Sequence, residues 1–136
     1  MPVTYLADTS AWNRFGQGAP IWRERLAARQ VAICPPVLLE LLYSAIGRSD
    51  YRRLAHDLSY VPSLELDRRA SQLALRTQAV LAERSQHRGP TPVDLLVAAI
   101  AELGGARLVH YDKHFDAIAR VTSQPTEWLA RRGSLD

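Results

Sequence analysis

The stretch "PVDLLVAAIAELGGARLVHYDKHFDAIA", residues 92–119, predicts a helix, a tight turn and a buried strand in direct succession. Apolar residues recur with helical spacing over 92–103, and the glycine pair at 104–105 interrupts that pattern. The short apolar run 106–111 then indicates a strand. Because so short a turn makes the helix antiparallel to the strand, we expect the helix to begin beside the end of that strand.

Similar short apolar runs at 3–8 and 31–34 predict two further strands. Strands that alternate with helical patterns favour an α/β fold, in which a parallel sheet carries helices on both faces. A loop is predicted at 85–92, where glycine and proline break the helical spacing. Besides 92–103, helices are predicted at 20–29, 36–46, 49–60 and 67–86.

The length of 136 residues and the hydrophobic content of 47% fit one domain, residues 1–136, with a single core. The chain has no signal-peptide pattern and no run near the roughly 18 to 20 apolar residues of a membrane span, so we predict a cytoplasmic protein without membrane contact. The single cysteine, Cys34, follows an apolar run and is predicted to lie in the core. A net charge of +3 and a preference for arginine permit a nucleic-acid partner.

Five acidic residues are predicted to gather at one edge of the sheet, where sites form in open parallel sheets. Asp8 and Asp112 each end a predicted strand, and Asp116 lies one turn further on. Glu40 lies early in the helix after the second strand, and Asp94 lies in the first turn of the helix at 92–103. We therefore treat these five side chains as the candidate site.

Most of these acids also have a purely structural interpretation. Asp94 completes a capping box with Thr91, and Asp8 can simply end a strand before a short helix. Asp112 can cap a helix, and Asp116 can be an exposed first-turn acid stabilised by the helix dipole. Glu40 differs because its helix is apolar on almost every side, so its carboxylate needs a cation, a donor or an exposed stripe where it pairs with an arginine.

The polar residues between 110 and 116 can be arranged in two incompatible ways. A strand period of two would put His110, Asp112, His114 and Asp116 on one face, as a mixed metal site. Instead, Phe115 and later apolar residues follow helical spacing, which indicates that the strand ends at Asp112. We adopt the helical interpretation, which leaves both histidines outside the site.

Carboxylates gathered at one edge repel each other unless a divalent cation holds them. An all-oxygen set favours Mg²⁺ or Mn²⁺, and these ions serve phosphoryl chemistry. The candidate site therefore suggests hydrolysis of a phosphodiester.

Four segments together resemble the PIN-domain ribonucleases, in particular the VapC-type toxins of bacterial toxin–antitoxin pairs. They are "YLADTSAW" at 5–12, "LLEL" at 38–41, "GPTPVDLLVAAIA" at 89–101 and "LVHYDKHFDAIA" at 108–119. The resemblance implies a three-layer α/β/α PIN-like domain with a mainly parallel sheet of four or five strands. It also implies Mg²⁺- or Mn²⁺-dependent endoribonuclease activity on RNA, a cognate VapB-type antitoxin whose C-terminal segment blocks the site, and a homodimer.

The same resemblance assigns roles to individual residues. Asp8, Glu40, Asp94 and Asp112 match the family's acidic quartet, and Asp116 matches a frequent fifth carboxylate. We expect Asp8 and Asp94 to hold one metal, with Glu40 as a ligand or as the base that orients the attacking water. The supporting residues expected around them are the hydroxyl of Thr9 or Ser10 and the possible RNA contacts Arg14, His87 and Arg88.

The sequence departs from the family pattern at one position, and two functions other than endoribonuclease are considered. His110 stands where many family members carry a small hydroxyl or amide residue, which affects the geometry at Asp112. A doubly wound phosphohydrolase would use Asp8 as nucleophile, but this chain lacks the second aspartate such enzymes place at the position of Ser10. An inactive PIN-like RNA-binding protein would not need the intact set of acids.

Overall fold

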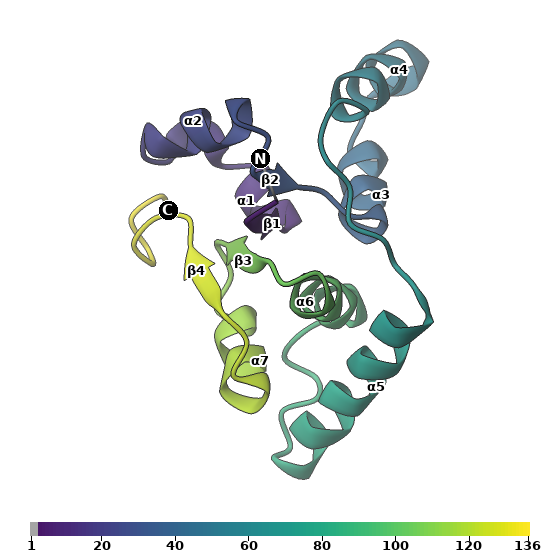
Figure 1. Ribbon diagram of the computed structural model, residues 1–136, viewed down its shortest axis with the longest axis vertical. Helices are drawn as coiled ribbons and strands as arrows, with labels where there is room; N and C mark the ends of the chain where they lie inside the picture. Colours follow the sequence, from purple (N-terminus) through teal and green to yellow (C-terminus); the bar gives the residue numbers. More distant parts are fainter. Residues whose placement is uncertain (1–2) are drawn as a thin grey trace.

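Four short parallel strands form the centre of the computed structural model, which describes residues 3–136. They are β1 (Tyr5–Ala7), β2 (Val31–Ala32), β3 (Arg107–His110) and β4 (Thr126–Trp128), in the order β2-β1-β3-β4 (Figure 1). The three predicted strands are present with narrower bounds, and the parallel sheet is confirmed. β4 does not correspond to any of the strands predicted from the sequence.

The predicted helices are present within a few residues of their expected bounds. No helix of residues 3–136 has the combination of length and apolar character needed to span a bilayer. The period change after Asp112 is also confirmed, since a helix begins at His114. The helical segments are α1 (Thr9–Trp12), the 3-10 helix η1 (Phe15–Gln17), α2 (Ile21–Ala27), α3 (Pro35–Tyr43), α4 (Gly47–Leu58), α5 (Arg68–Glu83), α6 (Pro92–Leu103) and α7 (His114–Thr122).

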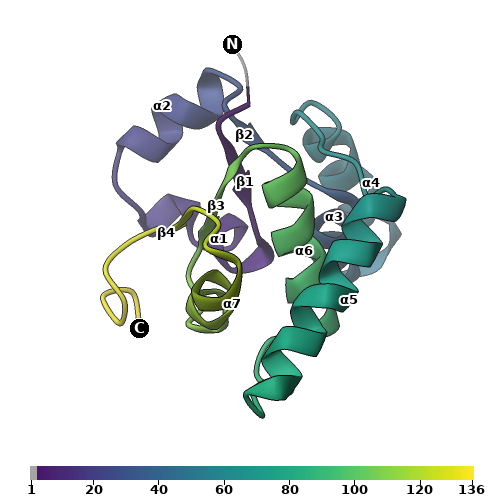
Figure 2. The same ribbon diagram turned by 60° about the horizontal axis from the view of Figure 1, so that its bottom comes forward.

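The sheet separates two hydrophobic clusters, as alternation along each strand requires. One face carries Leu6 and Leu108, which pack against α3, α5, α6 and α7. The opposite face carries Ala7 and Val109, which pack with α1, α2 and Leu129 of the C-terminal segment. Figure 2 shows α5 and α6 on one side of the strands and α2 on the other. The three-layer α/β/α arrangement is therefore confirmed.

The order of the strands determines where a site can form. From β1 the chain moves to β2 on one side, and it then crosses to β3 on the other side of β1. The switch point, where ligands bind in open α/β sheets, therefore lies between the carboxyl ends of β1 and β3. Helix α6 begins at the same edge, because Gly104 and Gly105 turn its end directly into β3. Gly105 has a φ of +67°, which glycine adopts at little cost.

Candidate metal centre

Asp8 lies directly after β1 and is 6% exposed. Its Oδ1 accepts hydrogen bonds from the Ser10 hydroxyl at 2.7 Å and from the Ala11 N–H at 3.2 Å. Burial away from water raises the pKa of the carboxyl to about 7, and the nearby charge of Asp94 acts in the same direction. Asp8 caps α1, but the raised pKa shows that this position costs free energy when the carboxyl is ionised.

The two hydroxyls after Asp8 each hold a different carboxylate. Ser10 Oγ donates to Asp8 and also accepts the N–H of Tyr111 at 2.8 Å, so it links the ends of β1 and β3. Thr9 Oγ1 donates to Glu40 Oε1 at 2.6 Å. Glu40 is exposed and accepts a hydrogen bond from this hydroxyl, so of the alternatives that the sequence left open the structure shows an exposed position with a donor. Its partner is this hydroxyl, which brings α3 to the end of β1.

Asp94 forms the predicted capping box in full. Its Oδ2 accepts the Thr91 N–H at 2.8 Å, and its own N–H donates to Thr91 Oγ1 at 3.1 Å. Its pKa is nevertheless raised, chiefly by burial and also by the charge of Asp112. By contrast, Asp67 caps α5 in the open, and its hydrogen bond from the Ala70 N–H lowers its pKa. Asp94 is therefore a cap that faces a second carboxylate.

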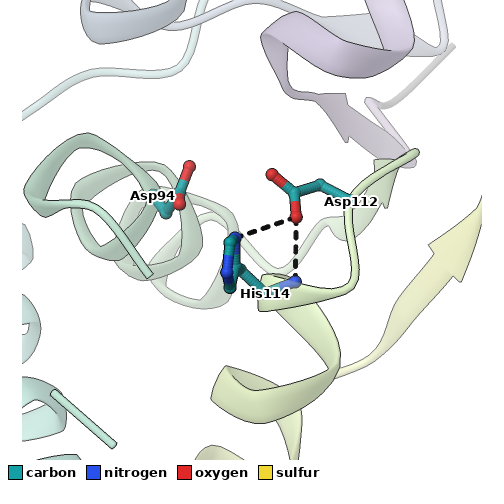
Figure 3. A group of neighbouring side chains, drawn as sticks. All are labelled: Asp94, Asp112 and His114. Carbon is teal, nitrogen blue, oxygen red and sulfur yellow. Dashed lines mark hydrogen bonds and ion pairs between the residues drawn. The ribbon is translucent and has the colours of Figure 1, made fainter. Parts of the chain in front are cut away.

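Asp112 occupies the turn between β3 and α7, together with His114. Its Oδ1 accepts the His114 N–H at 2.9 Å and lies 3.1 Å from His114 Nδ1. Asp94, Asp112 and His114 each offer a ligand atom, and these atoms all lie within 4.8 Å of one another (Figure 3). The structure thus joins the two predicted carboxylates and places His114 beside them, contrary to the prediction that it lies outside the site.

His110 lies behind this centre and is fully buried. Its ring packs against Phe115 and Trp128, and its Nδ1 accepts the Asp112 N–H at 3.2 Å. Burial lowers the pKa of His110 to about 4, so its ring is neutral near pH 7. His110 therefore supports the backbone of Asp112. Within residues 3–136, the group of neighbouring ligand atoms consists of Asp94, Asp112 and His114 and does not include His110.

Asp116 has a partner of a different kind. Its Oδ1 accepts the indole N–H of Trp128 at 3.1 Å, which connects α7 to β4. Within the described part of the chain, the compact group of ligand atoms does not include Asp116. Its assignment as the fifth carboxylate stays a prediction.

The predicted RNA contacts come from two separate segments of the chain. Arg14 donates to the Ser10 carbonyl at 3.0 Å, and its guanidinium stacks over the ring of Tyr111. His87 and Arg88 are exposed in the loop before α6. That loop reaches the centre at Gly89, where an added Cβ would lie 3.6 Å from His114 Cδ2.

An apolar groove of about 550 Å³ opens beside Glu40. Its walls come from α3 and the start of α6, and Thr9 and Glu40 also line it. Leu39 and Tyr43 are among its lining residues and are 69% and 92% exposed. Large apolar side chains this exposed are typical of a surface that binds a partner.

A family model described as "PIN domain" matches residues 5–121. The chain is similar to Ribonuclease VapC18 of Mycobacterium tuberculosis, with 38% identity over 98% of this chain and 100% of the relative. It is also similar to Ribonuclease VapC2 of the same species, with 41% identity over 94% of each chain. A DNA-bound VapBC structure from Salmonella typhimurium shares the fold, with a TM-score of 0.75 at 20% identity over 94% of this chain and 99% of that one.

Proposed function

This chain belongs to the PIN-domain family, and on that premise we propose that it is an endoribonuclease of the toxin type, dependent on Mg²⁺ or Mn²⁺. Its relatives of 34 to 41% identity are named as VapC ribonucleases. The observation that carries the proposal is the meeting of acids at the switch point. Burial raises the pKa of both Asp8 and Asp94, and each carboxyl feels the charge of another acid.

This donor set fits a divalent cation. Carboxylates that are buried and close together destabilise the protein when they are ionised, and a bound cation removes that penalty. The ligand atoms of Asp94 and Asp112 are near enough to reach one ion, and the charge of Asp94 helps to raise the pKa of Asp8. We assign Asp8, Asp94 and Asp112 as its principal holders.

When bound, the cation would lower the pKa of an attacking water and neutralise charge on phosphate oxygens. The protein's own residues set the geometry for that reaction. Ser10 fixes Asp8, and Thr91 occupies Oδ2 of Asp94, which leaves the other oxygen of that carboxylate for the centre. Thr9 holds Glu40, an exposed carboxylate that we assign as the base orienting the water and accepting its proton.

The remaining predicted residues have supporting roles in the proposal. Asp116 would complete the acidic set from α7, where Trp128 orients its carboxylate. Arg14, His87 and Arg88 would contact RNA phosphates, because Arg14 binds the Ser10 carbonyl, the loop of the other two approaches His114 at Gly89, and arginine pairs well with phosphate oxygens. Phosphate contacts of this kind position a nucleic acid without reading its sequence.

We also propose a VapB-type antitoxin as partner, with a C-terminal segment that blocks the centre. The structures with the same fold include VapBC toxin–antitoxin complexes. In this chain Thr9 and Glu40 line the apolar groove, so a segment bound there would lie beside the proposed base. A homodimer in the cytoplasm remains part of the proposal.

Cleavage assays with matched variants test this function. The purified protein, freed of any partner, should cleave RNA in Mg²⁺ or Mn²⁺ and stop in EDTA. Asp8→Asn and Asp94→Asn should each remove nearly all cleavage, whereas Asp67→Asn should keep it, because Asp67 is an equivalent helix cap away from the centre. Cleavage by Asp8→Asn at the wild-type rate would overturn the proposed site.

An expression test examines the toxin role. Induction of the wild-type protein should arrest growth, and Glu40→Gln should relieve the arrest at an equal protein level. Equal arrest by both proteins would show that the toxicity is not catalytic.

A further inference from the structure

We propose that His114 is a direct ligand of the cation and that its imidazole makes the centre select Mn²⁺ over Mg²⁺. This inference rests on the proposed metal-dependent function and adds a nitrogen donor to its carboxylates. His114 begins α7, two residues after Asp112, and it shares with Asp94 and Asp112 the compact group of ligand atoms. The three side chains converge on one space (Figure 3).

The spacing of these atoms fits one octahedral ion. Ligands at about 2.1 to 2.2 Å from a metal lie about 3.0 Å apart when they are adjacent and about 4.3 Å apart when they are opposite. His114 Nδ1 lies 3.1 Å from Asp112 Oδ1, and all three ligand atoms lie within 4.8 Å of one another. His114 and Asp112 already have the spacing of adjacent ligands, and Asp94 lies close enough to join them by a small movement of its side chain.

The main chain holds His114 in place relative to Asp112. The His114 N–H donates to Asp112 Oδ1, so the turn that positions the carboxylate also positions the imidazole. Its side chain is 37% exposed, which leaves the ring accessible from solvent. The other three histidines are placed differently: His110 is fully buried, His56 on α4 packs against Tyr60, and His87 is exposed in the loop before α6.

An imidazole changes which ion such a site prefers. Mg²⁺ favours oxygen ligands and keeps its water shell, whereas first-row transition metals accept imidazole nitrogen. Three carboxylates alone would discriminate weakly between Mg²⁺ and Mn²⁺. A nitrogen donor added to them should strengthen Mn²⁺ binding more than Mg²⁺ binding.

A simpler role for His114 is to donate a hydrogen bond to Asp112 and orient that carboxylate. Pulsed electron paramagnetic resonance of bound Mn²⁺ separates the two roles, because a directly bound nitrogen modulates the Mn²⁺ signal. With one equivalent of Mn²⁺, the full-length wild type should show ¹⁴N modulation. His114→Gln should lose it, and the matched control His56→Gln should keep it.

Competition between the two ions tests selectivity without measuring catalysis. His114→Gln should weaken Mn²⁺ binding by at least about 10- to 100-fold, the loss typical even for a residue that only orients a metal ligand, and Mg²⁺ binding by less. His114→Asp restores an all-oxygen set, so it should bind both ions and lower the preference for Mn²⁺ at least several-fold.

The outcomes distinguish this inference from the proposed function. Mn²⁺ bound without ¹⁴N modulation, or with modulation that persists in His114→Gln, would overturn the role of His114 and leave the carboxylate centre intact. Failure of the wild type to bind either ion would overturn both. Modulation lost only in His114→Gln, together with reduced selectivity in His114→Asp, would establish the nitrogen ligand.

Discussion

Neutralising Asp8 should stabilise the metal-free protein in a way that depends on pH. Its folded pKa of about 7 stands well above the reference value of 3.8, so the folded state resists ionisation. The stability that the protonated carboxyl provides is fully present below about pH 4 and is lost as pH rises through about 7. Asp8→Asn removes this dependence, while its side-chain oxygen can still accept from Ser10 and Ala11.

The magnitude follows from the shift in pKa. Each unit corresponds to about 1.4 kcal/mol, so the raised pKa of Asp8 lowers the free energy of unfolding by about 4 kcal/mol at pH 8, and by about 2 kcal/mol at pH 5, where only the unfolded state is ionised. In EDTA, the free energy of unfolding of Asp8→Asn relative to wild type should therefore rise by roughly 2 to 3 kcal/mol between these pH values. Urea denaturation of both proteins at pH 5 and pH 8 measures this difference.

Asp67→Asn is the matched control, since Asp67 caps α5 but its pKa is lowered. The difference between this variant and wild type should stay constant between pH 5 and pH 8, because both the folded and the unfolded carboxyl are ionised there. A difference between Asp8→Asn and wild type that is equally flat would refute the reasoning. Asp8 would then be an ordinary helix cap with no penalty for its charge.

Three further predictions concern other parts of the centre and its frame. In EDTA, Asp94→Asn should have a melting temperature equal to or above that of the wild type. For a dissociation constant of about 1 mM, 10 mM Mn²⁺ should raise the wild-type melting temperature by roughly 3 to 6 °C. Asp94→Asn should lose most of that increase. Thr9→Val should reduce RNA cleavage by releasing Glu40, with a change in stability within about 0.5 kcal/mol because the contact is exposed; an unchanged cleavage rate would exclude the role of this hydroxyl. Gly105→Ala should cost about 1 kcal/mol in urea denaturation because its φ is +67°, whereas Gly16→Ala, which also meets open space but has no positive φ, should cost less.

Strand β4 and the position of His114 were not predicted, and both depend on tertiary contacts. β4 has three residues, all half-buried, and two of them are Thr126 and Glu127, so neither alternation nor an apolar run marks it. It exists because its backbone pairs with β3. The position of His114 likewise depends on how the turn after Asp112 meets the first turn of α6, a contact between segments that sequence spacing does not describe.

The sequence by itself determined the alternation of strands and helices, the parallel sheet and the acids at its carboxyl edge, because hydrophobic period and short turns are local properties of the chain. The motifs also carried the family resemblance. Tertiary structure decided which acidic side chains lie close together and how much free energy it costs to ionise each carboxyl in the folded protein. Asp94 and Asp67 both cap helices, but burial beside Asp112 raises the pKa of one, while a hydrogen bond in the open lowers the pKa of the other. That difference arises from packing and solvent exposure, which a capping pattern does not contain.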